Sequence, residues 1–306
     1  MGSRLCPSCG AAAPITRDEQ LWPIGRRCAT CGYVVAVVDD IPQYAPTMAS
    51  STISFDPAAF AQLAAREDGH FWFEPRNRLL VGLAGRFFPE ARCYLEIGCG
   101  TGTVLAAVAA SREWSRLAGA EMHPAGLTYA RRRLGDRAEF VQLDARKIPV
   151  RAAFDLVGAF DVLEHIAEDG AVMREVYSAL VPGGGFLVAV PQHPALWSRA
   201  DDIGRHVRRY CRGELERKLD EAGFEIQFST SYVSLLLPFM FMNRRLSRGP
   251  PDESTSEFAR RELDVPPAIN SALRWVLEAE VGMTLKGVSW PVGGSRIVVA
   301  RRPANT

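Results

Sequence analysis

Two stretches of the chain carry residue types that could do chemistry. The first holds Cys6, Cys9, Cys28 and Cys31, which form two C-x-x-C pairs, each followed by a glycine. Four thiolates in this arrangement supply a closed tetrahedral Zn²⁺ site, and the glycines fit the tight knuckle turns that such sites use. Because no coordination position is left open, we expect the zinc to be structural rather than catalytic.

The second stretch is a glycine-rich turn. It lies between an apolar run, Cys93–Ile97, that predicts a buried strand and an apolar segment, 104–110, that predicts a helix. Gly98, Gly100 and Gly102 follow G-x-G-x-G spacing, which is neither the dinucleotide nor the phosphate-loop pattern. Glycines let the backbone adopt positive φ and let a ligand approach it closely. The helix that follows points free N–H groups at the turn.

Two acidic residues narrow the kind of ligand. Glu96 stands at the end of the predicted strand, where a carboxylate would repel a pyrophosphate but would suit a ligand carrying an ammonium and a sulfonium. Glu121 follows a second apolar segment, 116–120. An acidic residue at the end of that strand can bind the two hydroxyls of a ribose. The stretch therefore favours a cationic sulfur nucleoside.

On these residues the chain resembles the Rossmann-like S-adenosylmethionine-dependent methyltransferases, from about Arg76 to the C-terminus. The resemblance implies an α/β fold with a seven-stranded, mostly parallel, doubly wound sheet, in which the last strand inserts antiparallel between two others. The expected strands after the glycine turn alternate with helices. Those further strands are expected at 116–120, 138–143, 154–160, 186–190, 224–230 and 295–301.

The resemblance also implies which residues hold the cofactor, S-adenosyl-L-methionine. The acidic residue after the third strand, Asp144, would bind the adenine amino group, and Arg76 would be available to the methionyl carboxylate. The complete expected set is Arg76, Glu96, Gly98, Gly100, Gly102, Glu121, Met122, Asp144, Ala145 and Phe160.

Three residues are candidates for the chemistry at the methyl acceptor. Asp161 ends the fourth strand and should face the centre of methyl transfer. His165 is the nearest candidate general base, because imidazole titrates near neutral pH, although a histidine there could equally make a structural hydrogen bond. His206 is a second candidate base, in the loop 191–210 that follows the fifth strand.

The substrate is expected to contact that loop and an aromatic segment near residue 71. The loop is basic and contains aromatic residues, which suits an anionic substrate, while the aromatic segment predicts either a lid or a seam between domains. The expected substrate-binding residues are Phe71, Trp72, His193, Trp197, Arg205 and Tyr210. A further apolar run, 233–242, predicts a core helix, with a pocket wall or an interfacial anchor as alternatives.

The length of 306 residues suits one large domain and one small domain. We expect a zinc ribbon at 1–46, a linker and lid segment at 47–75 that includes the Ser/Thr run 50–52, and a methyltransferase domain at 76–306. The net charge of +1 gives no general argument for nucleic acid as partner. The C-x-x-C pairs, with no signal-peptide pattern and no apolar run long enough to span a bilayer, favour the cytoplasm.

Three functions compete on this evidence. The first is methylation of a small-molecule acceptor at oxygen or carbon, because the residues after the fourth strand and the apolar C-terminal region suit it. The second is an rRNA or tRNA methyltransferase that grips RNA with its ribbon, although the ribbon has only four arginines, at 4, 17, 26 and 27. The third is a non-catalytic binding protein that keeps the fold.

Overall fold

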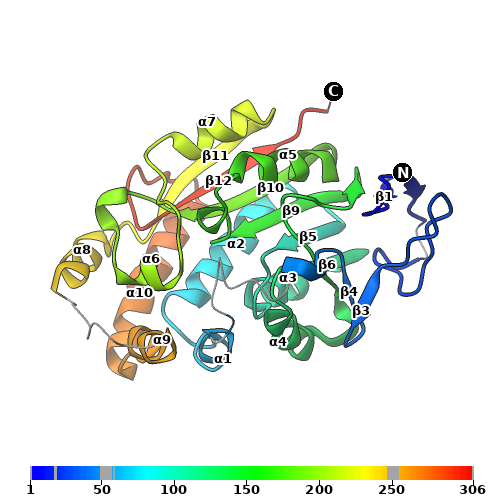
Figure 1. Ribbon diagram of the computed structural model, residues 1–306. Coiled ribbons are helices and arrows are strands. Elements are labelled where there is room, and N and C mark those ends of the chain that lie inside the picture. The colour runs from blue at the N-terminus through cyan, green and yellow to red at the C-terminus, as the bar shows by residue number, and fades with distance from the viewer. Residues whose placement is uncertain (1, 17–18, 49–56, 58, 247–254, 305–306) are drawn as a thin grey trace.

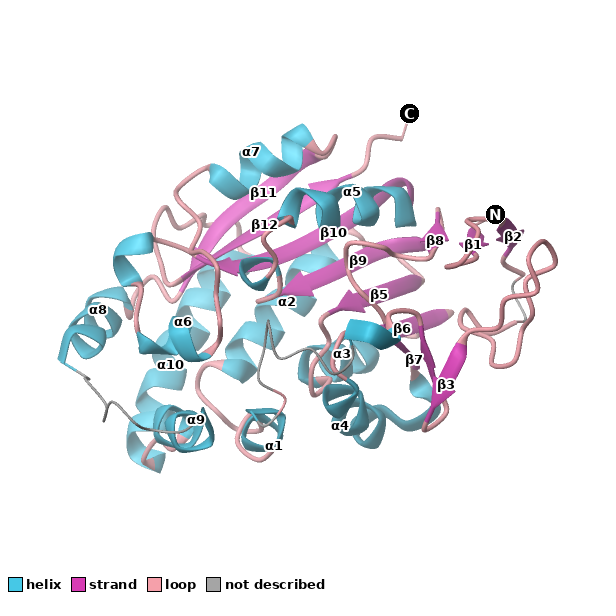
Figure 2. Ribbon diagram, in the orientation of Figure 1, coloured by secondary structure: helices cyan, strands magenta, loops and turns pink. Residues whose placement is uncertain are grey.

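The computed structural model describes residues 2–16, 19–48, 57, 59–246 and 255–304 (Figure 1). Its centre is a nine-stranded sheet in the order β11-β12-β10-β9-β5-β6-β7-β4-β3 (Figure 2). The strands from the resembled domain are β5 (Cys93–Ile97), β6 (Arg116–Glu121), β7 (Glu139–Gln142), β9 (Phe154–Phe160), β10 (Leu180–Pro191), β11 (Glu225–Tyr232) and β12 (Ser295–Arg301).

These seven strands confirm the predicted fold class. Strands β5, β6, β7, β9 and β10 run parallel, and β12 pairs antiparallel with both β10 and β11, as the resemblance implied. Because successive side chains of a strand point to opposite faces, the apolar strands feed two separate cores. On β9, for example, Val157 belongs to one core and Leu156 to the other.

Helices cover both faces of the sheet. On one face α5 (Asp169–Ala179) and α7 (Glu214–Glu221) contribute buried residues to the first core. The second core receives α2 (Phe73–Phe87), α3 (Thr103–Ser111), α4 (Pro124–Leu134) and α10 (Pro267–Leu285). Shorter or peripheral helices are α1 (Ala59–Ala64), α6 (Arg199–Ile203), α8 (Leu237–Leu246) and α9 (Thr255–Leu263).

The N-terminal segment joins the same sheet, which the sequence did not predict. Strand β4 (Ile41–Gln43) pairs parallel with β7, and β3 (Ala36–Val38) follows it at the edge. The side-chain amide of Gln142 fixes this junction, accepting from the Ala45 N–H at 3.0 Å and donating to the Ala45 carbonyl at 2.8 Å. Buried Leu21 and Trp22 also belong to the first core.

A second, small sheet contains the strands next to the first cysteine pair. It has the order β2-β1-β8, with β1 (Ser3–Leu5), β2 (Ala12–Pro14) and β8 (Val150–Arg151). Segment 1–46 therefore contributes strands to both sheets and side chains to the first core. The division into units at 1–46, 47–75 and 76–306 remains a proposal. The predicted Ser/Thr linker at 50–52 lies outside the described residues.

The preferred prediction for 233–242, a core helix, is wrong. Leu235, Phe239 and Met242 are 42%, 51% and 55% exposed, while Val233 and Met240 line the cavity described below. The core face was already covered by α2 and α10, which contact each other, so α8 lies at the periphery. Within the described residues, no helix has both the length and the apolar content needed to cross a bilayer.

Candidate active site

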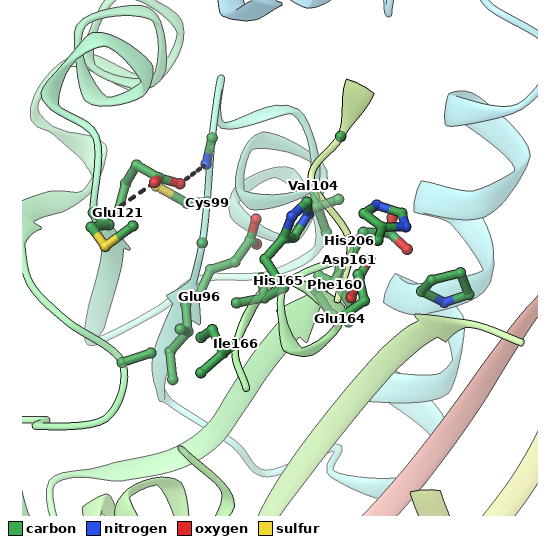
Figure 3. Close-up of a pocket in the computed structure, with 18 of the residues that line it drawn as sticks. Glu96, Cys99, Val104, Glu121, Phe160, Asp161, Glu164, His165, Ile166 and His206 are labelled. Carbon is green, nitrogen blue, oxygen red and sulfur yellow. Dashed lines mark hydrogen bonds between the residues drawn. The ribbon is translucent and has the colours of Figure 1, made fainter. Parts of the chain in front are cut away.

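A cavity of about 840 Å³ opens at the carboxyl ends of β5, β6, β7 and β9. This is the edge at which open α/β sheets bind ligands. Figure 3 shows Glu121 on one side of it, Asp161, Glu164 and His206 on the other, and Glu96 between them. Ligand pockets commonly measure roughly 300–1,000 Å³, so this one has room for a nucleoside and a second small molecule.

The glycine turn forms one wall. Gly98, Gly100 and Gly102 have φ of 64°, 52° and 79°. A Cβ on Gly98 would lie 2.3 Å from Cγ2 of Val162, and one on Gly102 would lie 2.9 Å from the Cα of Ala130. The first two glycines line the cavity, whereas Gly102 lies behind the wall at the start of α3. Gly102 therefore shapes the turn and does not face a ligand.

We expect Gly102→Ala to destabilise the protein by about 2–5 kcal/mol, because positive φ costs a non-glycine residue about 1–2 kcal/mol and overpacking adds about 1–3 kcal/mol. Gly183→Ala is the matched control: it has φ of 80° but nothing within 4 Å of the added Cβ. The control should therefore show only the backbone cost in urea unfolding. Equal losses for the two variants would contradict close packing behind the turn.

Glu96 lies between the two halves of the cavity and is 3% exposed. Its carboxylate accepts a hydrogen bond from the Tyr94 hydroxyl at 3.1 Å. Burial raises the pKa of Glu96 to about 8, because desolvation of the carboxylate outweighs the opposing effects of the Tyr94 hydrogen bond and the Arg76 charge. A positively charged ligand in the cavity would favour the ionised form of Glu96.

Glu121 turns its carboxylate toward the glycine turn. It accepts hydrogen bonds from the backbone N–H groups of Gly100 at 3.1 Å, Met122 at 2.8 Å and His123 at 3.0 Å. Burial raises the pKa of Glu121, and these N–H donors partly offset that effect. Glu121 thus faces the cavity and not bulk water, at the position where a ribose would need an acceptor.

The end of β7 supplies the next part of the wall. Met122, Asp144 and Ala145 all line the cavity. Asp144 already binds the Arg146 guanidinium at 2.9 Å and the Arg146 N–H at 2.9 Å. A ligand amino group would therefore share the Asp144 carboxylate with Arg146.

Arg76 and Asp161, predicted for different roles, form an ion pair with each other. The Arg76 guanidinium carbon lies 4.7 Å from the ring centre of Trp72 and 5.8 Å from that of Phe160, in cation–π geometry. All four side chains line the cavity. Asp161 directly follows β9 with φ of 56°, a conformation that a non-glycine residue rarely adopts and that often marks a functional site.

The two candidate histidines lie beside each other, with ring centres 4.7 Å apart and ring planes at 86°. Burial lowers the pKa of His165 to about 3, so His165 would be a weak base at neutral pH. His206 differs because a hydrogen bond of 2.9 Å joins its Nδ1 to Oδ1 of Asp201, so Nε2 is the ring nitrogen that remains for another partner. Of the two, His206 is the better placed to accept a proton.

Five of the six residues predicted to bind substrate do not line the cavity: Phe71, His193, Trp197, Arg205 and Tyr210. Tyr210 is completely buried and donates its hydroxyl to Asp169 at 2.7 Å, and Trp197 binds Asp202 at 2.8 Å on the surface. Arg205 is exposed. In the loop 191–210, Asp201, His206 and Arg209 line the cavity instead.

Sequence reasoning predicted a linker and lid over 47–75 but named no residue before Phe71 as part of the site. Phe60 of α1 packs over the glycine turn, with Cε1 3.6 Å from the position of a Cβ on Gly100. Glu67 accepts a hydrogen bond from the Thr101 hydroxyl at 2.7 Å. Both residues line the cavity. No pattern marked them, since a short helix before the domain carries no signal about where it packs.

The four predicted zinc ligands converge. The Sγ atoms of Cys6 and Cys31 lie 3.6 Å apart, those of Cys9 and Cys28 lie 3.7 Å apart, and all four lie within 4.8 Å of one another. Zn–S bonds of about 2.3 Å in a tetrahedron require S···S separations of about 3.8 Å, so the cluster fits the ion. The Gly10 and Gly32 N–H groups close the two knuckles onto the carbonyls of Cys6 and Cys28 at 2.9 Å each.

Comparison with known proteins agrees with this geometry. Residues 95–188, which include the glycine turn and β9, match a family model described as a methyltransferase domain. The crystal structure of the (4+2)-cyclase SpnF has a similar fold, with a TM-score of 0.51, 22% identity, and coverage of 76% of this chain and 83% of that one. Residues 95–188 are therefore similar to a methyltransferase domain, and the chain has the Rossmann-like α/β fold of the solved structure.

Two curated relatives share part of the sequence. A probable S-adenosylmethionine-dependent methyltransferase of Mycolicibacterium smegmatis is 29% identical over 164 residues, covering 52% of this chain and 61% of the relative. The trans-aconitate 2-methyltransferase of Methylobacterium radiotolerans is 32% identical over 123 residues, covering 40% of this chain and 47% of the relative. The chain thus spans only about half the length of these relatives.

Proposed function

We propose that this protein transfers the methyl group of S-adenosyl-L-methionine to a small-molecule acceptor. The observation that carries the proposal is the single cavity that joins the glycine turn and Glu121 to Asp161, Glu164 and His206. The first part has the donors and acceptors that a nucleoside needs, and the second offers an oriented imidazole. Relatives described as methyltransferases support the same reaction class.

In this proposal the part of the cavity lined by the glycine turn and Glu121, the donor half, binds S-adenosylmethionine. The part lined by Asp161, Glu164 and His206, the acceptor half, binds the molecule that is methylated. S-adenosylmethionine supplies an electrophilic methyl group on a sulfonium, which needs little further activation. Glu121 would hold the ribose hydroxyls, and Glu96 would stabilise the positive charge near the centre of the cavity. Apolar Phe160 and Val233 would exclude water, and alignment of the acceptor would contribute much of the rate. His206 would stand where the acceptor loses its proton.

The acceptor is proposed to be a small oxygen or carbon nucleophile, of lipophilic or anionic character. RNA is disfavoured by the arginines of the N-terminal segment. Arg4 is 5% exposed and forms an ion pair with Glu19, which also pairs with Arg26 at 3.0 Å. Arg27 donates to the Gly32 carbonyl at 3.0 Å, and Arg17 lies outside the described residues. This surface offers little free positive charge to a phosphate backbone.

Transfer of a heavy methyl group tests the proposal. Metabolite extracts and total RNA are each incubated with the enzyme and deuteromethyl S-adenosylmethionine, and the products are examined by mass spectrometry. A small molecule that gains the label is the expected outcome. Label found in RNA instead would replace the small-molecule proposal with the RNA alternative. Donor binding without label in either pool would favour a non-methylating role of the fold.

We expect the affinity for S-adenosylmethionine to rise between pH 6 and pH 7, by roughly tenfold at most, because Glu96 must lose its proton to stabilise the cationic ligand. Because the pKa of Glu96 is about 8 without ligand, most Glu96 carboxyl groups are protonated throughout this pH interval. Calorimetric titration at the two pH values measures the change. Glu96→Gln should bind more weakly at pH 7 and lose this pH dependence; an unchanged slope would remove Glu96 from this role.

The raised pKa of Glu96 also has a consequence for stability. The folded state binds the proton more tightly than the unfolded state, whose carboxyl titrates near 4.3. The contribution of Glu96 to the free energy of unfolding is therefore full below that value and is lost as pH rises toward 8. Glu96→Gln should accordingly gain stability relative to the wild type as pH rises through this window.

We also propose that Cys6, Cys9, Cys28 and Cys31 hold a structural Zn²⁺. The support is the fit of the sulfur separations to a tetrahedral ion and the two knuckle turns. With four protein ligands the ion would have no open position for a substrate. Its task would be to fix the N-terminal segment, whose strands extend the main sheet.

A further inference from the structure

Glu164 is a buried acid that the proposed reaction does not use. Its side chain is completely buried and lines the cavity. Neither of its carboxylate oxygens has a hydrogen-bond partner among the described residues. Buried polar side-chain atoms nearly always have a partner, and leaving a charge unpaired costs several kcal/mol, so Glu164 calls for a ligand that the described residues do not supply.

The cationic side chains around Glu164 already form ion pairs with other carboxylates. Arg76 forms an ion pair with Asp161, and the Nε of Arg209 binds Oδ1 of Asp201 at 2.6 Å. Both guanidinium groups that act electrostatically on Glu164 are thus paired with another carboxylate. Burial and the nearby Asp161 raise the pKa of Glu164 well above its ordinary value, as expected for an acid without a cation of its own.

Two imidazoles complete a cluster with this acid. One carboxylate oxygen of Glu164, one ring nitrogen of His165 and one ring nitrogen of His206 all lie within 4.8 Å of one another. Three ligands bound to one ion at about 2.0–2.2 Å lie within this separation of each other, so the cluster can close around a metal with little movement. Figure 3 shows the three side chains converging beside Asp161.

The hydrogen bonds of the two imidazole rings also resemble those of metal-bound histidines. The Nδ1 of His206 is bonded to Asp201, a carboxylate that accepts further hydrogen bonds from the backbone N–H of Ser198 at 2.8 Å and from Arg209. His165 makes hydrogen bonds to the backbone of the segment that bears His206. A metal-ligating histidine usually binds a carboxylate or a carbonyl through its other nitrogen, which fixes the tautomer and orients the ring.

We propose that Glu164, His165 and His206 bind a divalent transition-metal cation in the acceptor half of the cavity, beside the site of methyl transfer. Two nitrogen ligands and one carboxylate favour Mn²⁺, Fe²⁺, Co²⁺ or Zn²⁺ over Mg²⁺ and Ca²⁺, which prefer oxygen ligands throughout. Three protein ligands leave coordination positions open toward the cavity. This site is distinct from the closed cluster of four cysteines.

The site narrows the acceptor to a molecule with an ionisable hydroxyl group, an inference that rests on the proposed methyl transfer. With the metal bound, His206 is a ligand and no longer the base. The cation next to the hydroxyl lowers the pKa of the hydroxyl, so its proton leaves to solvent before transfer. The acceptor oxygen then forms a bond to the methyl carbon while the carbon–sulfur bond breaks, and its electron pair stays on sulfur. The products are the methyl ether and S-adenosylhomocysteine, with no oxidation or reduction.

Titration with Mn²⁺ tests the site without any need for activity. The full-length protein, with its cysteine cluster loaded with zinc, is titrated while free Mn²⁺ is followed by electron paramagnetic resonance. We expect one Mn²⁺ per chain, with affinity lowered at least about tenfold in Glu164→Gln and in His206→Gln. Glu221→Gln, on the exposed end of α7, is the matched control and should bind as the wild type does.

Two further measurements distinguish a failure of the metal site from a failure of the proposed function. Thermal unfolding shows whether each variant is folded, and His206→Gln replaces Glu164→Gln if the latter is not. Titration with S-adenosylmethionine tests the donor half independently. Donor binding without Mn²⁺ binding, or equal Mn²⁺ binding by the wild type and both ligand variants, would overturn the metal site while leaving the proposed function intact. Mn²⁺ binding without donor binding would overturn the function and not the metal site.

Discussion

Glu121→Ala is expected to weaken the binding of S-adenosylmethionine by about 1–3 kcal/mol, or roughly 5- to 150-fold in the dissociation constant. The reason is the loss of charged hydrogen bonds to the two ribose hydroxyls. Alanine would also leave the buried N–H groups of Gly100, Met122 and His123 without the carboxylate that they now donate to. Calorimetric titration of the folded variant measures the change.

A matched variant separates this effect from a general loss of charge. Glu90 is exposed and lies outside the cavity wall, so Glu90→Ala should bind the donor as the wild type does. If Glu121→Ala retained wild-type affinity, Glu121 would have to be removed from the donor site. The proposal that the ribose lies beside Glu121 in the cavity would then be abandoned.

Cys28→Ser is expected to remove almost all zinc from the cysteine cluster and to unfold the cluster. Structural zinc contributes on the order of 10 kcal/mol to the folding of small modules, so loss of one of four thiolates is a large change. Metal analysis should show the loss of the one zinc per chain that the cysteine cluster holds. Because β4 pairs with β7, we also expect the edge of the main sheet to lose protection from hydrogen exchange around residue 142.

Cys211→Ser is the control for that experiment. Cys211 is an exposed free cysteine outside the cluster, and its replacement should leave zinc content and hydrogen exchange unchanged. Equal zinc content in the wild type and Cys28→Ser would show that the four sulfurs converge for another reason. Zinc loss with normal protection of the sheet edge would limit the metal to a local role.

Local patterns were sufficient to predict the central fold. The strands Cys93–Ile97 and Phe154–Phe160 begin and end where their apolar runs do, because both are buried on two faces and bounded by turn residues. The glycine turn could also be predicted, because its conformation is imposed by the glycine residues themselves. Glu96 and Glu121 could be located because a position at a strand end fixes which edge of the sheet a side chain reaches.

The rest of the site depends on packing that no local pattern records. Glu164 occupies a short helical turn after β9, and only tertiary structure shows that it is buried without a hydrogen-bond partner. The loop 191–210 was expected to offer its aromatic side chains to the substrate. Instead Tyr210 donates a buried hydrogen bond to Asp169, and Asp201 is turned inward, where it binds both Arg209 and His206.

The N-terminal segment shows the same limit. The spacing of the cysteines was sufficient to predict convergence of four sulfurs, since the ligands are local in sequence. Pairing of Gln43 with Gln142 is a non-local contact between short strands, and such contacts leave no periodic signal in either segment. The predicted ribbon unit at 1–46 stays a proposal, and the contact that the sequence did not predict is the pairing of its last strand with the main sheet.

A crystal structure with S-adenosylhomocysteine is the most direct test of the donor site. The account predicts one molecule in the cavity, with both ribose hydroxyls within hydrogen-bonding distance of Glu121, adenine beside Asp144, and sulfur directed toward Asp161 and His206. A molecule bound outside the cavity, or with its ribose away from Glu121, would contradict it.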